Sequence, residues 1–500
     1  MAEQRERPIS IAILAVGGQG GGVLTKWLVD IAEANGYIAQ STFVAGVAQR
    51  TGATVYCVEM FPKDRAESLG REPVFTPYPV PGDVDLVVVG EMAETGRAIQ
   101  KGFVTPNITT LISSSHRIYS VLEKEALGDG IMDQEPIARV AEQAAKKFIC
   151  FDMAAAADET GSVISSVLLG AIAGSGALPF DRDAFEATIR DSGRAVDASL
   201  KGFAAGFDGV GQEAPATLME SQTAEPAGPN GEALKARIES ELPAQVQNMA
   251  LHGALRALDY QDFKYAASYL DRVKEILVSD TGSRDFELTT EVARQLALQM
   301  CYEDTIRVAD LKTRSDRFER IREHVAAAPD QPAHVVEYFH PRFEEVCDTL
   351  PAPVGRFMLQ SAFMQKMLSP FFRSGREIKT TSISGFILLH VLAKFRRFRR
   401  STYRFKNQQD LVHDWLDRII NAAVDDYDYA LSIARCIEMV KGYGDTYQRG
   451  LTRYRAAIEA ASGVTSANRA AAIRRLHTAA LADEKGKVFG DALSTLGKVH

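Results

Sequence analysis

The chain has 500 residues, which is too long for a single hydrophobic core and indicates two or three domains. Its composition is that of an ordinary globular protein, and its formal net charge of −8 argues against wholesale nucleic-acid binding. The N-terminal segment MAEQRERPIS lacks the apolar stretch of a signal peptide. The longest apolar stretch of the second half, FILLHVLA, is too short to span a bilayer. We therefore expect a cytoplasmic protein with no membrane partner.

Up to about residue 207, short apolar runs alternate with helical ones. Several apolar runs are nearly continuous in Val and Ile, which is typical of strands buried on both faces. The alternation predicts an α/β fold in residues 1–207, with a doubly wound, mostly parallel, Rossmann-like sheet. The predicted strands are Ile9–Val16, Tyr37–Phe43, Thr54–Met60, Asp85–Val89, Thr109–Ser113 and Lys147–Asp152.

The first predicted strand runs into the glycine-rich sequence GGQGGG, residues 17–22. A Walker A loop would need a lysine after the last glycine, where this chain has Val23, so we reject that interpretation. A dinucleotide fingerprint is matched by Gly18 and Gly20, but Val23 again stands where the third glycine or alanine belongs. The second strand also ends without the acid that holds a ribose, so NAD binding is disfavoured.

The same glycines have a simpler physical use. They let backbone N–H groups approach an anion or another chain, and the helix expected from Gly21 points its positive end there. Gln19 adds an amide that donates or accepts a hydrogen bond. A tight strand-to-helix turn alone needs one or two glycines rather than five. Gly18, Gln19, Gly20 and Gly21 are therefore candidate cofactor-binding residues.

A second cluster lies between the second and third predicted strands, in FVAGVAQRTGATVYCVEM. Gln49 and Arg50 lie in a glycine-flanked loop at the sheet edge where ligands of doubly wound folds bind. Arg50 can pair with a carboxylate or phosphate through two hydrogen bonds, or it can be a solvated surface arginine. Glu91 follows the fourth strand and is a further candidate ligand contact, unless it only caps the next helix. We identify no catalytic residue and no metal ligand.

The pattern changes after residue 207. Residues 208–231 are rich in Gly, Ala, Pro, Ser, Thr and Glu and predict a linker. Residues 232–500 place apolar residues at three- and four-residue spacing, which predicts an α-helical C-terminal domain. No fixed period recurs, so a repeat solenoid is not supported.

One stretch of the helical region is strongly basic. Phe371–Lys406 holds ten basic residues and one acidic residue, Glu377. The stretch can dock an acidic partner, or its arginines can pair with the chain's own surplus of acids. Its interleaved aromatic residues can also stack nucleobases, but the acidic total disfavours a nucleic-acid partner.

The five cysteines are odd in number and widely scattered. No two have the spacing of a zinc site or of a ferredoxin-type cluster. We interpret them as buried or idle thiols, so any iron–sulfur cluster would belong to another chain. They are Cys57, Cys150, Cys301, Cys347 and Cys436.

The two glycine-containing motifs together resemble a known family. AVGGQGGGVLTKWLVDIAEANG followed by AGVAQRTGATVYCVEMFP resembles the gamma-type domain of 2-oxoacid:ferredoxin oxidoreductases over about residues 8–205. The chain has Arg50-Thr51-Gly52 where many relatives read Arg-Gly-Gly. SSVLLGAIAGSG resembles the helix that closes that domain. The QRTGA variant and the long helical extension are most similar to the beta subunit of indolepyruvate:ferredoxin oxidoreductases.

The resemblance implies a division of labour between two chains. A large alpha subunit would carry thiamine diphosphate, Mg²⁺ and [4Fe–4S] clusters, and would decarboxylate an arylpyruvate. This chain would hold none of these cofactors alone, and its glycine edge would cover the site or bind coenzyme A at the interface. Electrons would pass to ferredoxin or another acidic acceptor.

Three hypotheses follow from the sequence. The leading one is an accessory subunit, inactive alone, of a thiamine-dependent complex that oxidises arylpyruvates. The second is a non-catalytic interaction protein that binds a nucleotide or acyl-CoA. The third, an NAD-dependent dehydrogenase, is disfavoured by the broken fingerprint.

Overall fold

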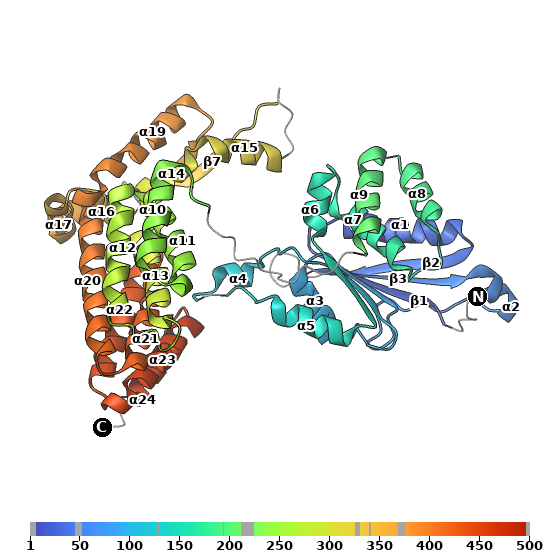
Figure 1. Cartoon of the computed structure of the whole chain (residues 1–500). Helices are drawn as coiled ribbons and strands as arrows, with labels where there is room; N and C mark the ends of the chain where they lie inside the picture. Colours follow the sequence, from blue (N-terminus) through green and yellow to red (C-terminus); the bar gives the residue numbers. More distant parts are fainter. Residues whose placement is uncertain are drawn as a thin grey trace. The chain divides into compact units, whose positions relative to one another are not determined.

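The computed structural model describes residues 7–45, 53–128, 130–193, 195–211, 225–325, 331–339, 342–368 and 376–496. The chain divides into two compact units, Met1–Gln222 and Thr223–His500, which we call the sheet unit and the helical unit (Figure 1). Among the described helices, none has both the length and the apolar character needed to cross a membrane.

The sheet unit is built on one mixed sheet. Its strands are β1 (Ile9–Ala15), β2 (Tyr37–Val44), β3 (Thr54–Pro62), β4 (Leu86–Val89), β5 (Thr110–Ser114) and β6 (Lys147–Phe151). They form six strands in the order β2-β3-β1-β4-β5-β6. Strands β1, β4, β5 and β6 are parallel neighbours, whereas β3 pairs antiparallel with both β1 and β2. The prediction of an α/β fold with a mostly parallel sheet is confirmed. The antiparallel pairings arise because residues 45–53 are too few for a crossover helix, so the chain turns back as a hairpin.

Helices cover both faces of this sheet (Figure 1). Alternate residues of β1 enter two separate cores, because successive side chains of a strand point to opposite faces. Ile11 and Ile13 pack with residues of α1 (Gly21–Ala34) and α7 (Ile164–Ser175), while Ala12 and Leu14 pack with residues of α3 (Met92–Gln100) and α5 (Glu135–Ala144). The unit is therefore doubly wound, as predicted. Its helices are α1 (Gly21–Ala34), α2 (Lys63–Leu69), α3 (Met92–Gln100), α4 (Val121–Glu125), α5 (Glu135–Ala144), α6 (Met153–Glu159), α7 (Ile164–Ser175), α8 (Arg182–Asp191) and α9 (Val196–Gly209).

Helices α7 and α9 cross at very short range. A Cβ on Gly170 would lie 2.0 Å from the carbonyl oxygen of Phe203, and one on Gly206 would lie 2.0 Å from that of Val167. Only glycine permits this approach, which explains the glycines of the SSVLLGAIAGSG segment in physical terms. The crossing fixes the start of α7 beneath the loop that follows β1.

The helical unit follows the connection between the units. Helix α9 ends at Gly209 and α10 begins at Gly228, and residues 212–224 of the predicted linker lie outside the described residues. The core of the unit contains fully buried aromatic residues such as Tyr269 and Trp415. A short two-stranded sheet pairs β7 (Val336–Phe339) with β8 (Arg376–Lys379). The predicted helical C-terminal region is confirmed.

The helices of this unit are α10 (Gly228–Glu241), α11 (Ala244–Tyr260), α12 (Phe263–Leu277), α13 (Glu287–Met300), α14 (Thr305–Lys312), α15 (Ser315–His324), α16 (Phe343–Asp348), α17 (Ala352–Gln360), α18 (Ala362–Leu368), α19 (Ile383–Lys394), α20 (Tyr403–Ala423), α21 (Tyr427–Cys436), α22 (Gly444–Ser462), α23 (Ser466–Ala482) and α24 (Lys487–Leu496). Two 3-10 helices, η2 (Phe395–Ser401) and η3 (Ile437–Met439), complete it.

Candidate functional site

The glycine loop joins β1 to α1 at the carboxyl edge of the parallel strands. Gly18 has φ +94° and Gly20, the residue before α1, has φ +70°, both in the region that favours glycine. No described side chain caps the first turn of α1. The N–H groups of this turn and the positive end of the helix dipole therefore point to the edge of the sheet.

The glycines of this loop have different roles. A Cβ on Gly20 would lie 2.8 Å from Ser165 Oγ, and one on Gly21 would lie 2.6 Å from the ring of Tyr56. Around Gly17 and Gly18, by contrast, no described atom lies within 4 Å of the Cβ position. Gly20 and Gly21 are thus required by packing inside the unit, while the two earlier glycines present bare backbone at an open face.

Gln19 holds the loop to the neighbouring strand. Its side chain is only 5% exposed. Oε1 accepts a hydrogen bond from the N–H of Val16 at 2.8 Å, and Nε2 donates to the carbonyl of Gly90 at 2.9 Å. A Cβ on Gly90 would lie 2.2 Å from Gln19 Oε1, so a glycine after β4 leaves room for this clamp. The amide that we predicted as a binding group is engaged within the protein.

The clamp also determines the state of His116. Because Val16 and Gly90 orient the Gln19 amide, its Nε2 is the atom that lies 3.4 Å from His116 Nε2, which must then accept. His116 Nδ1 lies 2.7 Å from Ser114 Oγ and donates to it in this neutral tautomer. Burial lowers the pKa of His116, which agrees with a neutral ring.

Glu91 caps α3 and forms a buried ion pair. Its carboxylate accepts from the N–H groups of Ala93 and Glu94 at 3.1 and 3.0 Å and pairs with Arg117 Nη1 at 2.8 Å. Arg117 also pairs with Glu123, and its side chain is 5% exposed, so this arginine is a buried charge at the candidate site that our sequence reasoning missed. The available signal was its position just after β5, at the edge where functional side chains gather.

The loop that carries Gln49 and Arg50 lies outside the described residues. Its two ends are described: Val44 of β2 pairs with Val55 of β3, and Thr54 pairs with Ala15 of β1. The two strands that flank this loop therefore end and begin at the same edge of the sheet as the glycine loop, and the placement of Gln49 and Arg50 stays a prediction. The carboxylate of Glu94, whose pKa is raised chiefly by burial, accepts from the backbone of Ala53 at the end of that loop.

Exposed apolar side chains lie at the edge of the sheet that carries the glycine loop. Two of them neighbour residues that pack on the loop: Val163 is two positions before Ser165, which lies under Gly20, and the Phe43 ring lies 6.0 Å, centroid to centroid, from the Tyr56 ring beside Gly21. Monomeric proteins rarely gather such residues at one edge unless something covers them. We call these residues the apolar rim: Val23, Phe43, Val44, Ile118, Tyr119 and Val163.

The cysteines give no sign of metal chemistry in the described residues. All five are buried. Burial raises the pKa of Cys57 to about 12 and that of Cys347 to about 11, so these side chains stay as thiols rather than thiolates. Within the described ranges, no group of three or more His, Cys, Asp or Glu residues is placed to hold a metal ion.

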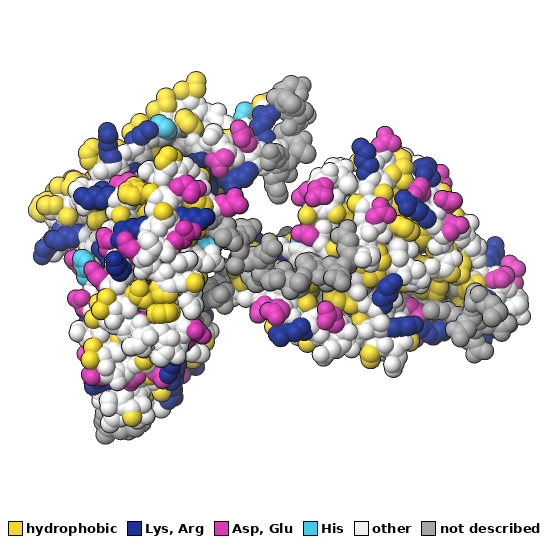
Figure 2. Space-filling view, in the orientation of Figure 1, with side chains coloured by type: hydrophobic (Ala, Val, Ile, Leu, Met, Phe, Trp, Pro, Cys, Tyr) yellow, Lys and Arg dark blue, Asp and Glu magenta, His cyan; other side chains and the backbone are white. Residues whose placement is uncertain are grey.

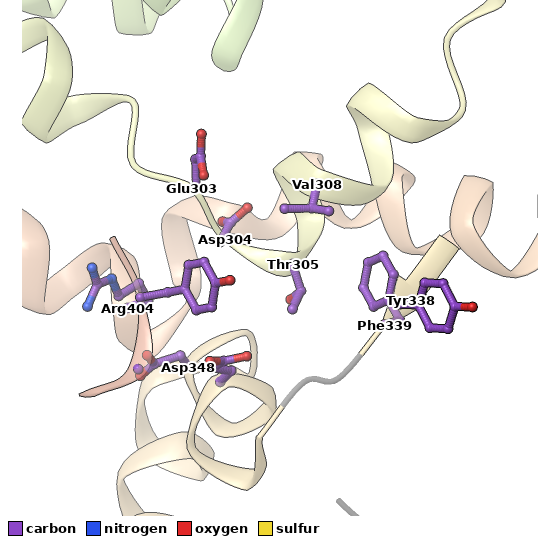
Figure 3. Close-up of a pocket in the computed structure, with 11 residues that line it drawn as sticks. Glu303, Asp304, Thr305, Val308, Tyr338, Phe339, Asp348 and Arg404 are labelled. Atoms are coloured by element: carbon purple, nitrogen blue, oxygen red, sulfur yellow. The ribbon is translucent and has the colours of Figure 1, made fainter. Parts of the chain in front are cut away.

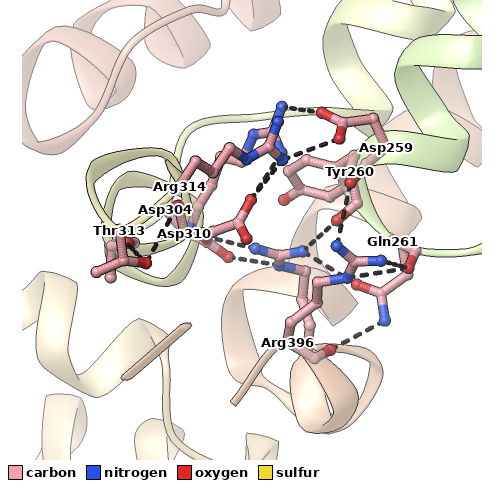
Figure 4. Close-up of polar contacts among 11 residues, drawn as sticks. Asp259, Tyr260, Gln261, Asp304, Asp310, Thr313, Arg314 and Arg396 are labelled. Atoms are coloured by element: carbon pink, nitrogen blue, oxygen red, sulfur yellow. Dashed lines mark hydrogen bonds and ion pairs between the residues drawn. The ribbon is translucent and has the colours of Figure 1, made fainter. Parts of the chain in front are cut away.

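Much of the basic stretch is used inside the helical unit (Figure 4). Arg399 is 1% exposed and pairs with Asp304 through two hydrogen bonds of 2.9 and 3.0 Å. Arg396 donates to the backbone carbonyl of Gln261, and Arg400 pairs with Asp262 at 2.7 Å. The predicted pairing with the chain's own acids therefore holds for Arg399 and Arg400, while Arg396 is held by backbone carbonyls, and the run itself forms the 3-10 helix η2.

A separate cavity of about 170 Å³ lies in the helical unit (Figure 3). Its walls carry acids, among them Glu303 and Asp348, and aromatic rings, among them Phe339. Burial raises the pKa of Asp348 to about 6, while Arg404 opposes that rise. Our sequence reasoning missed the cavity because its walls come from segments far apart in the chain.

Two family models match the chain, one in each unit. Residues 10–209 match the family described as pyruvate ferredoxin/flavodoxin oxidoreductase. Residues 246–460 match a family of unknown function, DUF6537. No curated protein matches the chain.

The chain is also similar to solved structures. The pyruvate oxidoreductase subunit PORC of Thermotoga maritima is 16% identical, with 41% of this chain and 97% of that one covered and a TM-score of 0.28. The gamma subunit of a keto/oxoacid ferredoxin oxidoreductase from Geobacter sulfurreducens PCA is 17% identical, with 40% and 98% covered and a TM-score of 0.28. A 2-oxoglutarate:ferredoxin oxidoreductase from Magnetococcus marinus, with 2-oxoglutarate, coenzyme A and succinyl-CoA bound, is 13% identical, with 47% and 37% covered and a TM-score of 0.30.

The glycine loop, the sheet edge and α7 all fall inside the first matched range. The sheet unit is thus similar to the pyruvate ferredoxin/flavodoxin oxidoreductase family over residues 10–209, and the helical unit is similar to a family of unknown function over residues 246–460.

Proposed function

We propose that this chain is an accessory subunit of a complex that oxidatively decarboxylates 2-oxoacids, and that the carboxyl edge of its sheet docks against the catalytic subunit. The observation that carries the proposal is the open backbone at Gly17 and Gly18, beside an uncapped helix N-terminus and within the apolar rim. The family match over residues 10–209 supports the same assignment.

The cofactors of this reaction are assigned to the large partner subunit. The described part of this chain offers buried thiols and no carboxylate cluster that would ligate a metal. Thiamine diphosphate, with Mg²⁺, supplies the carbanion chemistry of decarboxylation, and [4Fe–4S] clusters accept electrons for delivery to ferredoxin.

This chain's own residues have a positioning role. The Gln19 clamp and the Glu91–Arg117 pair hold the loop and α3 in place, so the edge is rigid before it meets its partner. The N–H groups around Gly17 and Gly18 fit a phosphate, such as the diphosphate of coenzyme A, or a carbonyl of the partner. The apolar rim excludes water from that contact.

Arylpyruvates such as indolepyruvate are the substrates that we assign within this class. The assignment depends on the QRTGA segment and on YFHPRFEEVCDTLPAPVGRF and KGYGDTYQRGLTRY, which resemble the beta subunit of indolepyruvate:ferredoxin oxidoreductases. The substrate pocket would belong mostly to the partner. The substrate assignment is therefore tested by measuring turnover of different 2-oxoacids by the complex, and not by mutations in the glycine loop.

The test is to co-express the full chain with the large thiamine-binding subunit of its host. We expect a brown complex that reduces a viologen dye with indolepyruvate and phenylpyruvate faster than with pyruvate or 2-oxoglutarate. Gly17→Leu should fold normally, since described atoms leave its Cβ position open, yet should weaken assembly or turnover at least tenfold. Gly211→Leu, a matched glycine with an open Cβ position, is the control. Normal assembly and turnover with Gly17→Leu would contradict the docking role of the edge.

The open glycines also favour a second candidate, a non-catalytic binding protein for a nucleotide or acyl-CoA. It predicts that the isolated chain binds coenzyme A in calorimetry and that Gly17→Leu abolishes the binding. The accessory-subunit proposal instead predicts an inactive, colourless chain when it is purified alone. Tight NAD binding by the isolated chain would favour the disfavoured dehydrogenase hypothesis.

A further inference from the structure

Helix α19 is attached to the helical unit by one face only. Leu389 and Gly385 lie on that face and are buried. Gly385 is required there, because a Cβ would lie 2.1 Å from the carbonyl oxygen of Lys379. Phe386, one helical turn from Leu389, has its ring centroid 6.4 Å from that of Phe318 in α15. The opposite face of α19 is left without a partner among the described residues.

Most of the exposed side chains on that opposite face are apolar. The exposed residues recur at three- and four-residue spacing and continue into η2, and hydrophobic side chains gather over α19 in Figure 2. Their exposed fractions, up to 82% for Ile383, amount to roughly 600 Å² of accessible surface, the upper end for a monomer's largest apolar patch. The residues are Ile383, Ile387, Leu388, Val391, Phe395 and Phe398.

A basic hollow lies beside this apolar face. The hollow has a volume of about 730 Å³, and His390, Lys394 and Arg397 are among the residues that line it. Lys394 and Arg397 make no hydrogen bond or ion pair with any described residue, although the chain has an excess of acids. The two carboxylates of the hollow, Asp262 and Asp310, are already paired with arginines.

We use the name α19 surface for the apolar residues of α19 and η2 together with the basic hollow. We propose that the α19 surface is a second docking surface for the large subunit. The large subunit would contact it with an apolar patch edged by acidic side chains. The inference rests on the proposed function, because it takes the occupant to be the partner in the same complex. Lys394 and Arg397, the two cations lining the hollow that are unpaired among the described residues, indicate that the partner presents negative charge there. The large apolar share indicates a permanent subunit rather than a transient carrier, since obligate interfaces are the more hydrophobic class.

The arrangement of the charges favours a protein over a bilayer. A helix that lies on an anionic membrane carries lysines and arginines along its polar face on both sides of the apolar stripe. Here His390, Lys394 and Arg397 all line one hollow, whereas Arg399 is buried and paired with Asp304. A concave basic hollow accepts acidic side chains that protrude from a protein partner, whereas a lipid surface is flat.

The experiment measures binding of the full chain to the separately purified large subunit by biolayer interferometry at 50 and 500 mM NaCl. Leu388→Asp/Val391→Asp should weaken affinity at least tenfold. Lys394→Glu/Arg397→Glu should weaken the affinity at 50 mM NaCl. The wild type should bind more weakly at 500 mM than at 50 mM NaCl, and this variant should lose most of that salt dependence. Hydrogen exchange of α19 should slow in the complex.

Matched variants at the other end of the unit serve as controls. Val424→Asp changes an exposed valine at the end of α20, about 30 Å along that helix from η2. Lys485→Glu/Lys487→Glu reverses the charge of two exposed lysines at the start of α24. Circular dichroism of every variant excludes unfolding as the cause, and the controls should bind as the wild type does.

Each other outcome overturns the inference. If the complex assembles and turns over while α19 stays unprotected and the variants bind normally, this inference fails and the proposed function stands. Loss of a dimer, or of binding to phosphatidylserine vesicles, with unchanged affinity for the large subunit would assign the surface to a second copy or to a membrane. If the wild-type chain does not bind the large subunit at all, the inference and the proposed function both fail.

Discussion

Replacing Gln19 with leucine tests whether this side chain holds the glycine loop or serves a ligand. The change leaves the carbonyl of Gly90 and the N–H of Val16 without their partner. A buried unsatisfied group costs about 1–3 kcal/mol. Because Val16 is only partly buried and water replaces part of its bond, we expect the sheet unit to lose about 2–4 kcal/mol of unfolding free energy.

The two tryptophans make this loss measurable in one unit at a time. Trp27 lies in α1 of the sheet unit and Trp415 in α20 of the helical unit. Labelling with 5-fluorotryptophan gives each unit its own ¹⁹F resonance during a urea titration. With a denaturant slope of about 2–3 kcal/mol/M, the Trp27 midpoint should fall by about 1 M urea while the Trp415 midpoint stays unchanged.

The control is Gln40→Leu, which changes an exposed glutamine of β2 in the same unit. It should leave both midpoints unchanged. If Gln19→Leu also left the Trp27 midpoint within about 0.2 M of the wild type, the clamp would contribute little and the reasoning from burial would be wrong. Gln19 would then be available for the ligand role that its sequence position suggested.

Three other predictions use the same assay. Because burial lowers the pKa of His116, the folded sheet unit binds that proton less readily than the unfolded chain, so its stability should decline as pH falls through about 6.5; His116→Asn should flatten that decline. Arg399→Met should cost the helical unit about 3–5 kcal/mol because it leaves Asp304 unpaired, whereas Arg397→Met should stay within about 0.5 kcal/mol. Burial raises the pKa of Asp348 to about 6, so the helical unit should lose stability as pH rises from about 4 to 6, and Asp348→Asn should recover about 1–2 kcal/mol at pH 7 after allowance for its partial exposure. Urea midpoints at pH 4, 5, 6 and 7 that move in parallel for variant and wild type would contradict either pH prediction.

Local patterns were sufficient for the elements of the sheet unit. The apolar runs that predict strands overlap all six strands of the sheet, because alternation and length distinguish a buried strand from a helix. The helix predicted from Gly21 does begin at that residue. A glycine loop followed by an amphipathic run is a local signal for the start of a helix.

The roles of individual side chains were less accessible. Gln19 and Glu91 were both predicted as binding residues, yet the folded chain engages the first with Gly90 and the second with Arg117. Their partners lie many positions away along the sequence. The basic run gave the same difficulty, because Arg397 and Arg399 look alike in sequence while one is exposed and the other buried.

The local sequence therefore determines much of the secondary structure of this protein without reference to long-range contacts. Residue type and spacing determine which segments become strands or helices and place the glycine loop between the first strand and the first helix. They also show that no two cysteines have the spacing of a metal site. These properties depend on neighbours within a turn or two. The hairpin of β2 and β3, the clamp under the glycine loop, the buried arginine of η2 and the bare face of α19 depend on which distant segments meet. These long-range contacts are determined by packing and by the need to satisfy every buried polar group. Both conditions apply only when the whole chain is folded.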